Sequence, residues 1–406
     1  MILTLFYYLK YRKIAKYGKK ETENYQISEI KKLLDYAYKN FECYKKIYDD
    51  AGIKPSDFNK LSDLDKFPVI TKNDLKSEIA KIKIKKNKYN WLKTTGSTGS
   101  PFEFPVDNRS KAMRRAAHLI SYGFFDKKIY RKTGIFWRDV RKNNFDRIKE
   151  FLLRRYWFSI YDTKSKKNIL SDEDFIKYNK RILNSKISQI DGYVSAILRY
   201  VKIIKKYNLK IPKLDHVSVG GEVLSLNSKK LIESVLKCRV FNRYGGSEIS
   251  LIAHEDNIKK NKLKIMNFRL YLESKNKKLF ITDFTNRAIP FIRYELGDLA
   301  EKNNWKYIEY VEGRSNLEFK ISNNEYLNSH FFHKIFRNFG DIHNFMVIQK
   351  KSKEFKIVID CDNFNKTKRS LLVKLGKQLP ELRFEITDEI ISESNLGKHK
   401  HFIPLE

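Results

Sequence analysis

Apolar side chains recur at helical spacing in the first part of the chain. They are Ile30, Leu33, Leu34, Ala37, Phe41, Tyr44 and Ile47. A repeat of three to four residues marks one face of a helix, and Gly52 is suited to end it. Further on, Thr71 is followed three residues later by Asp74, which resembles a capping arrangement at the start of a helix. We therefore predict a helix over 28–50 and another beginning after Thr71.

From about residue 90 to 300, short β-like runs alternate with helical stretches. Residues 217–219 and 279–282 are strand-like, and residues 227–236 have a helical pattern. Alternation of this kind predicts an α/β architecture with mostly parallel sheets flanked by helices.

The pattern changes after about residue 312. Residues 331–336 and 367–379 are helix-like, and residues 345–348, 355–359 and 382–386 are strand-like. The sequence thus predicts a small C-terminal α+β domain over 313–406, which follows a large α/β domain over 1–312.

The start of the chain is apolar over residues 1–9 and then strongly basic, with six Lys or Arg side chains up to Lys20. A secretory signal has the opposite order, with its cations before the apolar stretch. We predict a packed N-terminal helix; a weak peripheral contact with a membrane surface is the alternative. No apolar run approaches the ~18 residues of a membrane-spanning helix.

Composition adds two restrictions. The chain has 83 Lys and Arg against 48 Asp and Glu, a formal net charge of +35. Such an excess favours polyanionic ligands, yet most of these lysines are expected to form a solvated surface. No nucleic-acid-binding motif accompanies them, so we expect no nucleic-acid partner. The three cysteines, Cys43, Cys238 and Cys361, are far apart, which fits a reducing, cytoplasmic location.

Four polar clusters contain glycine or follow it. Residues 94–101, Thr-Thr-Gly-Ser-Thr-Gly-Ser-Pro, could bring backbone N–H groups and hydroxyls to a phosphate, or could form a polar turn. No Gly-Lys-Ser/Thr follows, so this is not a Walker loop. Gly220-Gly221-Glu222 permits close backbone approach to a ligand, or forms a strand-to-helix turn.

The other two clusters add an aromatic ring and carboxylates. Residues 242–248, Asn-Arg-Tyr-Gly-Gly-Ser-Glu, could stack Tyr244 on a base and place Glu248 on a Mg²⁺ ion bound to phosphates. Asp298 follows Gly297 at the end of an apolar run and could accept two ribose hydroxyls. Each cluster could equally be a surface turn.

In this order, the clusters resemble those of the adenylate-forming superfamily of acyl-CoA synthetases, adenylation domains and luciferases. The closest resemblance is to its phenylacetate–CoA ligase-like branch, which includes capsular-polysaccharide biosynthesis proteins. The stretches that carry the resemblance are FECYKKIYDDAGI, FPVITKNDLK, TTGSTGSP, GGEVLS, VFNRYGGSEISLIAHE, LFITDFTNRAIPFIRYELGDLA, VEGR and NLGKHK. Together they extend from about residue 30 to the end.

The resemblance implies roles for individual residues. The residues that would hold the ATP phosphates are Thr95, Ser97, Thr98 and Gly99. Those that would line the adenine pocket are Gly220, Gly221 and Glu222, with Tyr244 stacked on the base. Those that would approach the acyl group and the α-phosphate are Gly245, Gly246 and Ser247.

Four further roles follow from the same resemblance. Glu248 would bind Mg²⁺, and Asp298 would accept the ribose hydroxyls. Arg314 would contact ribose or phosphate at the hinge of a C-terminal lid, and Lys398 would reach the α-phosphate. The choice of Lys398 over Lys400 rests on the preceding Gly397.

The implied reaction is ATP-dependent activation of a carboxylic acid to acyl-AMP, with release of pyrophosphate and transfer to CoA. A sugar or glycan acceptor without CoA is an alternative, and so is a non-catalytic nucleotide-binding relative. Four residues depart from the superfamily pattern: Phe102 where Lys is frequent, Leu317 where Asp is common, and Asn323 and Asn324 where Gly is expected. In the family, the segment that corresponds to Leu317 and Asn323-Asn324 is the hinge of the lid, so the resemblance leaves the swing of the lid, and with it CoA chemistry, open.

The acid would bind between about residues 118 and 250. Candidates for its pocket are His118, Tyr122, Phe136, Trp137 and Tyr193, each of which could instead belong to the core.

Overall fold

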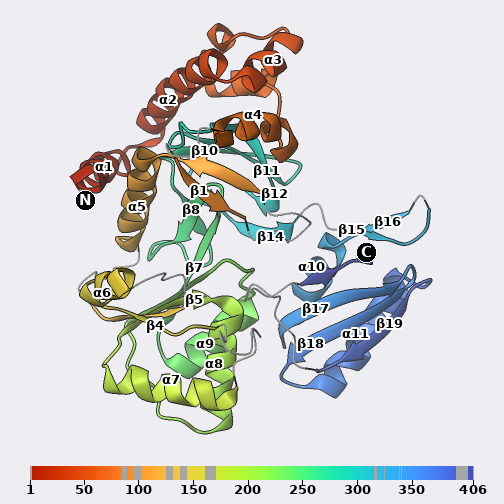
Figure 1. Cartoon of the computed structure of the whole chain (residues 1–406). Helices are drawn as coiled ribbons and strands as arrows, with labels where there is room; N and C mark the ends of the chain where they lie inside the picture. Colours follow the sequence, from red (N-terminus) through yellow and green to blue (C-terminus); the bar gives the residue numbers. More distant parts are fainter. Residues whose placement is uncertain are drawn as a thin grey trace. The chain divides into compact units, whose positions relative to one another are not determined.

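The computed structural model describes most of the chain. The described residues are 2–84, 89–94, 102–124, 131–137, 144–160, 171–302, 304–314, 318–323, 325–337, 339, 341–389 and 401–405. They form two compact units, one of Met1–Lys127 with Tyr244–Val311, the other of Lys128–Arg243 with Glu312–Glu406 (Figure 1). The division into domains 1–312 and 313–406 remains a prediction.

The first unit begins with helices. They are α1 (Ile2–Ile14), α2 (Lys19–Asn40), α3 (Glu42–Asp50), α4 (Lys72–Ile84) and α5 (Asn108–Tyr122), with short 3-10 turns at Pro55–Asp57 and Leu61–Lys66. The single helix predicted over 28–50 is wrong, because Phe41 is extended (φ −131°, ψ 116°) and separates α2 from α3. The Phe41 ring is buried, with its centroid 5.8 Å from that of Tyr36 and 6.4 Å from that of Tyr44.

The predicted cap of α4 is confirmed. The Asp74 carboxylate accepts hydrogen bonds of 2.7 Å from the backbone N–H and from the hydroxyl of Thr71. Just before the cap, Ile70 N donates to Arg293 O (3.1 Å), and Glu295 N donates to Ile70 O (2.9 Å). Since Arg293 and Glu295 lie in strand β12, these bonds fix the first residue of α4, Lys72, beside that strand.

The strands of the first unit include several antiparallel pairs. The hairpin β1 (Asn90–Lys93) and β2 (Glu103–Val106) flanks residues 94–102. Strands β10 (Leu270–Lys275), β11 (Lys278–Asp283) and β12 (Phe291–Glu301) form a sheet with β14 (Tyr310–Arg314) beside β12. Strands β8 (Ser250–Glu255), β9 (Leu263–Ile265) and β13 (Tyr307–Ile308) follow one another in a second sheet.

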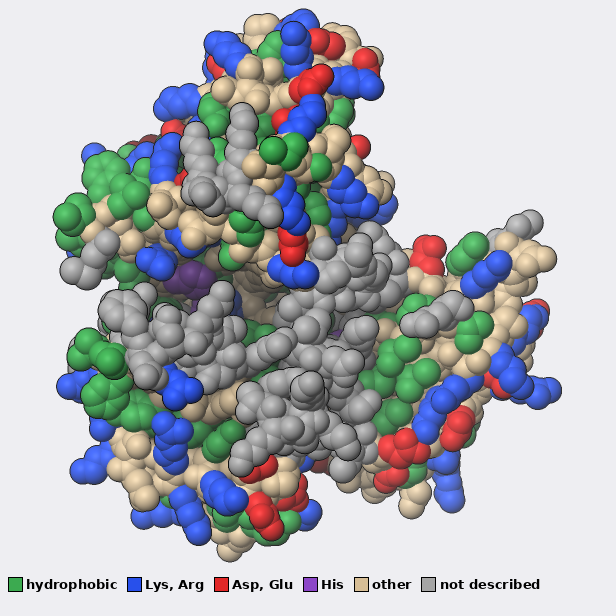
Figure 2. Space-filling view, in the orientation of Figure 1, with side chains coloured by type: hydrophobic (Ala, Val, Ile, Leu, Met, Phe, Trp, Pro, Cys, Tyr) green, Lys and Arg blue, Asp and Glu red, His purple; other side chains and the backbone are tan. Residues whose placement is uncertain are grey.

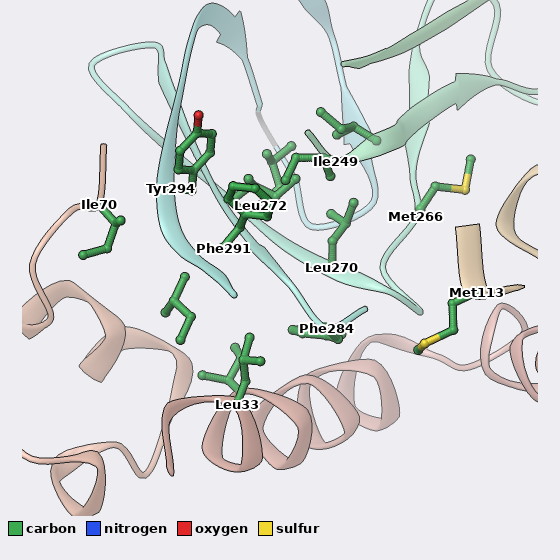
Figure 3. Close-up of a cluster of buried hydrophobic side chains, with 14 of the residues drawn as sticks. Leu33, Ile70, Met113, Ile249, Met266, Leu270, Leu272, Phe284, Phe291 and Tyr294 are labelled. Carbon is green, nitrogen blue, oxygen red and sulfur yellow. The ribbon is translucent and has the colours of Figure 1, made fainter. Parts of the chain in front are cut away.

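The core of the first unit joins its helices to these strands. Figure 3 shows Leu33 of α2 and Met113 of α5 with Leu270, Leu272 and Phe291 of the sheet. All five side chains are buried. Their burial supplies the apolar contribution that holds β10–β12 against the helices.

The second unit contains the predicted parallel strands. Strands β4 (Arg155–Trp157), β3 (Thr133–Phe136), β5 (Gln189–Tyr193), β6 (His216–Gly220) and the first residues of β7 (Arg239–Gly246) lie in that order, all parallel. The helices of this part are α6 (Asn144–Leu152), α7 (Asp172–Asn184), α8 (Val194–Lys206) and α9 (Leu226–Leu236). The α/β fold class predicted from the sequence is confirmed, with the parallel strands collected here.

The C-terminal part of the second unit has the predicted α+β pattern. Strands β19 (Arg383–Thr387), β18 (Glu354–Cys361), β17 (Ile342–Lys351) and β20 (Phe402–Ile403) form one sheet in that order. Helices α10 (His330–Arg337) and α11 (Phe364–Gln378) accompany it, as does the hairpin β15 (Glu318–Lys320) and β16 (Tyr326–Asn328). Helix α9 contacts this part, since Asn227 Nδ2 donates to Phe339 O (2.9 Å).

Within the part of the chain that the structure describes, no helix combines the length and the apolar character needed to cross a bilayer.

Candidate functional site

Two of the predicted site residues contact one another directly in the first unit. Tyr244 is near the end of β7, and Asp298 is in β12, 54 positions away. The Tyr244 hydroxyl donates to Asp298 Oδ2 at 2.7 Å, and both side chains are half-buried. Tertiary structure therefore places the aromatic ring of one cluster beside the carboxylate of another.

Glu248 lies in the turn between β7 and β8, and its carboxylate is close to a lysine that the motif analysis gave no role. Glu248 Oε1 is 3.3 Å from Lys72 Nζ at the start of α4. The side chain of Glu248 is 11% exposed and that of Lys72 is 36% exposed. Since Lys72 is a partly solvated cation, it can exchange this carboxylate for another anion.

Lys72 also lies near the stretch predicted to bind phosphate. Its Nζ is 5.9 Å from the ring centroid of Phe102. Phe102 and Thr94 hold the two ends of that stretch together, because Phe102 N donates to Thr94 Oγ1 (3.0 Å) and Thr94 N donates to Phe102 O (2.9 Å). The predicted phosphate contacts themselves lie outside the described residues: Thr95, Ser97, Thr98 and Gly99.

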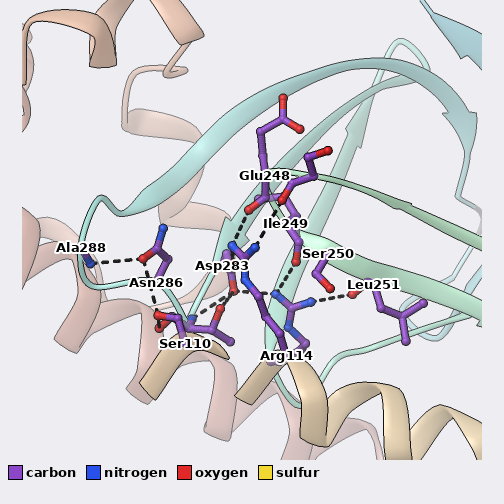
Figure 4. Close-up of polar contacts among 12 residues, drawn as sticks. Ser110, Arg114, Glu248, Ile249, Ser250, Leu251, Asp283, Asn286 and Ala288 are labelled. Atoms are coloured by element: carbon purple, nitrogen blue, oxygen red, sulfur yellow. Dashed lines mark hydrogen bonds and ion pairs between the residues drawn. The ribbon is translucent and has the colours of Figure 1, made fainter. Parts of the chain in front are cut away.

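A buried arginine of α5 holds the backbone of the Glu248 turn. Arg114 donates to the carbonyl oxygens of Ser247 (3.3 Å) and Glu248 (Figure 4). Burial lowers the pKa of the Arg114 guanidinium to about 10, while Asp283 acts in the opposite direction. The guanidinium is therefore still charged at neutral pH. In Figure 4 the Glu248 carboxylate points away from Arg114, so the scaffold leaves it pointing outward from the network.

A second buried arginine extends the same scaffold. Arg269 is fully buried and donates to Ile249 O (2.7 Å), Leu251 O (2.6 Å) and Asp283 Oδ1 (3.0 Å). Charge-assisted hydrogen bonds are among the strongest in proteins, particularly where water is excluded. The backbone of the turn that carries Glu248 is thus held by two buried arginines, Arg114 and Arg269, which both lie next to the Asp283 carboxylate.

Gly245 explains why this turn needs glycine. A Cβ atom at position 245 would lie 2.1 Å from the carbonyl oxygen of Ser250. Since that atom belongs to the backbone of β8, no rotamer change could relieve the clash. The close approach of the two backbones after Tyr244 is possible only without a side chain.

The predicted adenine-pocket cluster lies in the second unit, at the end of β6. Gly221 has φ +79°, and a Cβ there would lie 2.9 Å from Tyr193 Cε1. Gly220 lies against Arg243 O, 2.7 Å from where its Cβ would be, and Arg243 precedes Tyr244 in the chain. The cluster is therefore close-packed, with a left-handed turn that favours glycine.

Glu222 has a contact that the sequence did not predict. Its Oε2 accepts from Ser195 N (2.7 Å) and its Oε1 accepts from Ser195 Oγ (2.9 Å). Ser195 is the second residue of α8, where backbone N–H groups have no partner within the helix. The Glu222 carboxylate therefore caps α8.

The five candidates for an acid pocket separate into different environments. His118 Nε2 lies 3.2 Å from Ser250 Oγ in the first unit, and Tyr122 ends α5 in the same unit. In the second unit the rings of Trp137 and Tyr193 have centroids 4.0 Å apart. Phe136 is fully buried with its ring stacked on Phe158, which agrees with the alternative that it belongs to the core.

Several predicted residues cannot be placed. Lys398 and its alternative Lys400 lie outside the described residues, as do Leu317, Asn324 and the side chain of Arg314. Lys72 and Arg114 were not among the site residues predicted from the sequence. The sequence did contain an indication of Lys72. It directly follows the capping residue Thr71 within FPVITKNDLK, a stretch that resembles the family but to which no role was assigned.

The described residues set a limit on metal binding. Among them no group of three or more His, Cys, Asp or Glu side chains is arranged to hold a metal ion. Mg²⁺ commonly binds proteins through one or two carboxylates, with water and phosphate oxygens as its other ligands. A single carboxylate such as Glu248 fits an ion of that kind only together with a phosphate ligand.

Comparison with known sequences gives three informative results. No family model matches the chain. It is 25% identical over 337 residues to "Protein CapK" of Staphylococcus aureus, a match covering 76% of this chain and 69% of that protein. It is 45% identical over 56 residues to phenylacetate-coenzyme A ligase of Escherichia coli (strain K12), where the match covers only 14% of this chain and 13% of the relative.

Solved structures resemble the chain over a larger part of its length. A crystal structure of 2-hydroxyisobutyryl-CoA ligase in the postadenylation state, in complex with 2-HIB-AMP, has a TM-score of 0.73 at 14% identity and covers 96% of this chain and 90% of its own. The same ligase with 2-HIB-AMP and CoA has a TM-score of 0.61, over 95% of this chain and 92% of its own. O-succinylbenzoate coenzyme A synthetase of Bacillus subtilis, in complex with AMP, has a TM-score of 0.51 at 13% identity, over 77% of this chain and 67% of its own.

Proposed function

This chain has the fold of the adenylate-forming ligases and resembles their phenylacetate–CoA ligase-like branch, and we infer that it is an AMP-forming ligase. The reaction is carboxylic acid plus Mg·ATP to acyl-AMP and pyrophosphate, followed by transfer of the acyl group. The observation that supports it is the convergence, within one compact unit, of the Tyr244–Asp298 pair and of the Glu248–Lys72 pair beside the ends of the 94–101 stretch.

The chemistry requires charge stabilisation rather than a nucleophilic side chain. A substrate carboxylate oxygen attacks the α-phosphorus, a new P–O bond forms, and the bond to the pyrophosphate oxygen breaks. Negative charge spreads over the phosphoryl oxygens, so catalysis is mostly positioning and electrostatics. Mg²⁺, when bound, supplies charge neutralisation at the phosphates, and Glu248 is the residue that would hold it.

We assign Lys72 to the phosphate side of this site. Many superfamily members have a lysine directly after the phosphate stretch, and this chain has Phe102 there. Lys72 Nζ lies 5.9 Å from that ring and 3.3 Å from Glu248. Its ammonium group therefore occupies the region from which the missing lysine would act, although it comes from the start of α4.

Asp298 and Tyr244 suit the nucleoside. A carboxylate can accept both ribose hydroxyls, and the hydrogen bond from Tyr244 orients it. The Tyr244 ring is half-buried, and the base would stack on it. Lys398, which follows Gly397, would reach the α-phosphate.

The acceptor has two candidates. CoA is named for phenylacetate-coenzyme A ligase and for 2-hydroxyisobutyryl-CoA ligase, both of which this chain resembles. The second candidate is a hydroxyl or amine of a surface or capsular glycan, because the branch that this chain resembles includes capsular-polysaccharide biosynthesis proteins and CapK is similar over 76% of this chain. Leu317 and Asn323-Asn324 replace residues usual at the lid hinge and favour the acceptor without CoA.

A cytoplasmic location fits the thiol chemistry. All three cysteines are free. Burial raises the pKa of the Cys43 and Cys238 thiols to about 12, and raises that of Cys361 as well. Thiols with raised pKa values stay protonated at neutral pH, as expected of structural cysteines in a reducing compartment.

ATP–pyrophosphate exchange across a panel of aliphatic, aromatic and sugar acids tests the proposal. We expect exchange with at least one acid, its loss on chelation of Mg²⁺, and its loss in Lys398→Ala with ATP binding retained. Exchange in Lys398→Ala equal to wild type would mean that Lys400 has the role or that no lysine has it. A properly folded protein that binds ATP and exchanges with no acid would support the non-catalytic relative instead.

The acid can be sought without guessing it. The enzyme is mixed with ATP and small molecules from a cell extract, and mass spectrometry looks for a new acyl-AMP. Addition of CoA then separates the acceptors: conversion to an acyl-CoA supports the thiol, and an acyl-AMP that persists supports the glycan hydroxyl or amine.

A further inference from the structure

Helix α1 has two apolar stripes on opposite sides, and the core uses only one of them. The inner stripe is Tyr7, Tyr11 and Ile14, all buried. Tyr7 accepts a 2.8 Å hydrogen bond from Arg109 of α5, and the Tyr11 ring centroid is 4.9 Å from that of Phe268. These contacts anchor the helix, so its other side stays turned outward.

The outer stripe is Ile2, Leu5, Phe6 and Leu9, at the i, i+3, i+4, i+7 spacing of one helix face. All four side chains are exposed, Ile2 at 87% and Phe6 at 59%. Figure 2 shows hydrophobic side chains gathered over α1 on this face of the molecule. A contiguous apolar stripe of this kind usually marks an interaction surface.

Charge around the stripe indicates what it contacts. Six Lys or Arg side chains and no Asp or Glu occur up to Lys20. Exposed Arg12, Lys13 and Lys16 continue from the outer stripe toward the C-terminal end of the helix. An apolar stripe beside clustered cations fits a bilayer that carries anionic headgroups, where each cation near the surface adds attraction.

We propose that α1 docks this protein on an anionic membrane surface, with Ile2, Leu5, Phe6 and Leu9 entering the headgroup boundary and Arg12, Lys13 and Lys16 contacting the headgroups. The helix lies in the plane of the interface and does not span it, because it has only 13 residues. The inference does not depend on the reaction proposed above.

Helix α6 offers a matched control. It also presents exposed apolar side chains, Ile148, Phe151 and Leu152, with Phe151 at 67%. It includes Glu150, however, which pairs with Arg155 at 3.6 Å. Exposed hydrophobicity is therefore similar at both helices, and the uninterrupted positive charge is peculiar to α1.

Flotation of the full chain with vesicles tests the proposal. One vesicle contains phosphatidylglycerol and phosphatidylcholine in equal parts, the other phosphatidylcholine alone. We expect binding to the first only, weakened about tenfold or more in Phe6→Glu/Leu9→Glu and unchanged in Phe151→Glu/Leu152→Glu. Thermal unfolding and ATP binding of each variant are measured to confirm that the fold is kept.

Three results would overturn the proposal. The wild-type protein could fail to float with anionic vesicles at low salt. Binding could be equal in both double variants and disappear at high salt, which would mean general surface charge. Or the wild-type protein could be a dimer that Phe6→Glu/Leu9→Glu converts to a monomer, which would make the stripe an interface between two copies.

Discussion

Two glycine turns of this protein end in a glutamate, and the two glutamates make different contacts. Glu222 follows Gly220-Gly221 and uses both carboxylate oxygens to cap α8 through Ser195. Glu248 follows Gly245-Gly246-Ser247, and its carboxylate pairs with the partly exposed Lys72, while its backbone carbonyl is held by Arg114. One carboxylate contributes to the structure of a helix, and the other is presented by a structure that other residues hold.

This difference suggests a test that distinguishes a carboxylate available for ligand binding from one that stabilises the fold. The scaffold of Glu248 consists of buried arginines bonded to backbone carbonyls, so the side chain is not needed to keep the turn in place. At the other turn, the Glu222 side chain itself makes the hydrogen bonds that join the turn to α8. Substitution should therefore reduce activity at one turn and stability at the other.

The largest effect is expected at Glu248. Glu248→Gln keeps the shape but removes the charge, and we expect ATP–pyrophosphate exchange to fall about 100- to 1,000-fold, as for the loss of one preorganised electrostatic group. The free energy of unfolding should fall by no more than about 1 kcal/mol, because the pair with the partly solvated Lys72 is a weak one and the backbone of the turn is held by Arg114 and Arg269. A variant with full exchange would make Glu248 a turn residue like Glu222.

Asp298 should come next. Asp298→Ala removes the acceptor for the ribose hydroxyls, and we expect the affinity for ATP, measured by calorimetry, to fall about 10- to 100-fold, the range for a hydrogen bond to a charged group. Tyr244→Phe removes only the orienting hydroxyl and serves as the milder control. An unchanged affinity would show that Asp298 belongs to the structure alone.

Lys72 tests whether its contact with Glu248 is functional. Lys72→Met keeps the length of the side chain, and we expect the KM for ATP to rise about tenfold, which corresponds to about 1.4 kcal/mol. Lys76→Met, at an exposed position of the same helix, is the control and should leave the KM for ATP unchanged. If Lys72 served only to neutralise Glu248, Lys72→Met alone would leave the KM for ATP unaltered. The double variant Lys72→Met/Glu248→Gln would then lose no more exchange activity than Glu248→Gln alone.

Glu222 should give the smallest effect on turnover. Glu222→Ala leaves the start of α8 without its acceptor, and loss of a helix cap costs about 0.5–2 kcal/mol of stability. Thermal unfolding should show the decrease, while exchange below the transition keeps most of its rate. Ser195→Ala, which retains the backbone N–H donor, should cost less. If Glu222→Ala lost exchange without loss of stability, the comparison between the turns would fail.

The sequence by itself determined the local elements of this protein and the order of its motifs. The helical repeat, the cap at Thr71, the strand at 217–219 and the α+β tail could all be predicted, because each depends on neighbours within a few positions. The glycines could be recognised as turns for the same reason. The resemblance of the ordered motifs then indicated an adenylate-forming fold.

The tertiary structure decided which side chains contact one another. The helical spacing of apolar residues continues through Phe41, so no local pattern marks the break that its burial stabilises between α2 and α3. Ser195 and Lys72 reach Glu222 and Glu248 from distant parts of the chain, and periodicity carries no information at that range. Two similar turns thus acquired different contacts because folding brought a helix start to one carboxylate and a cation to the other.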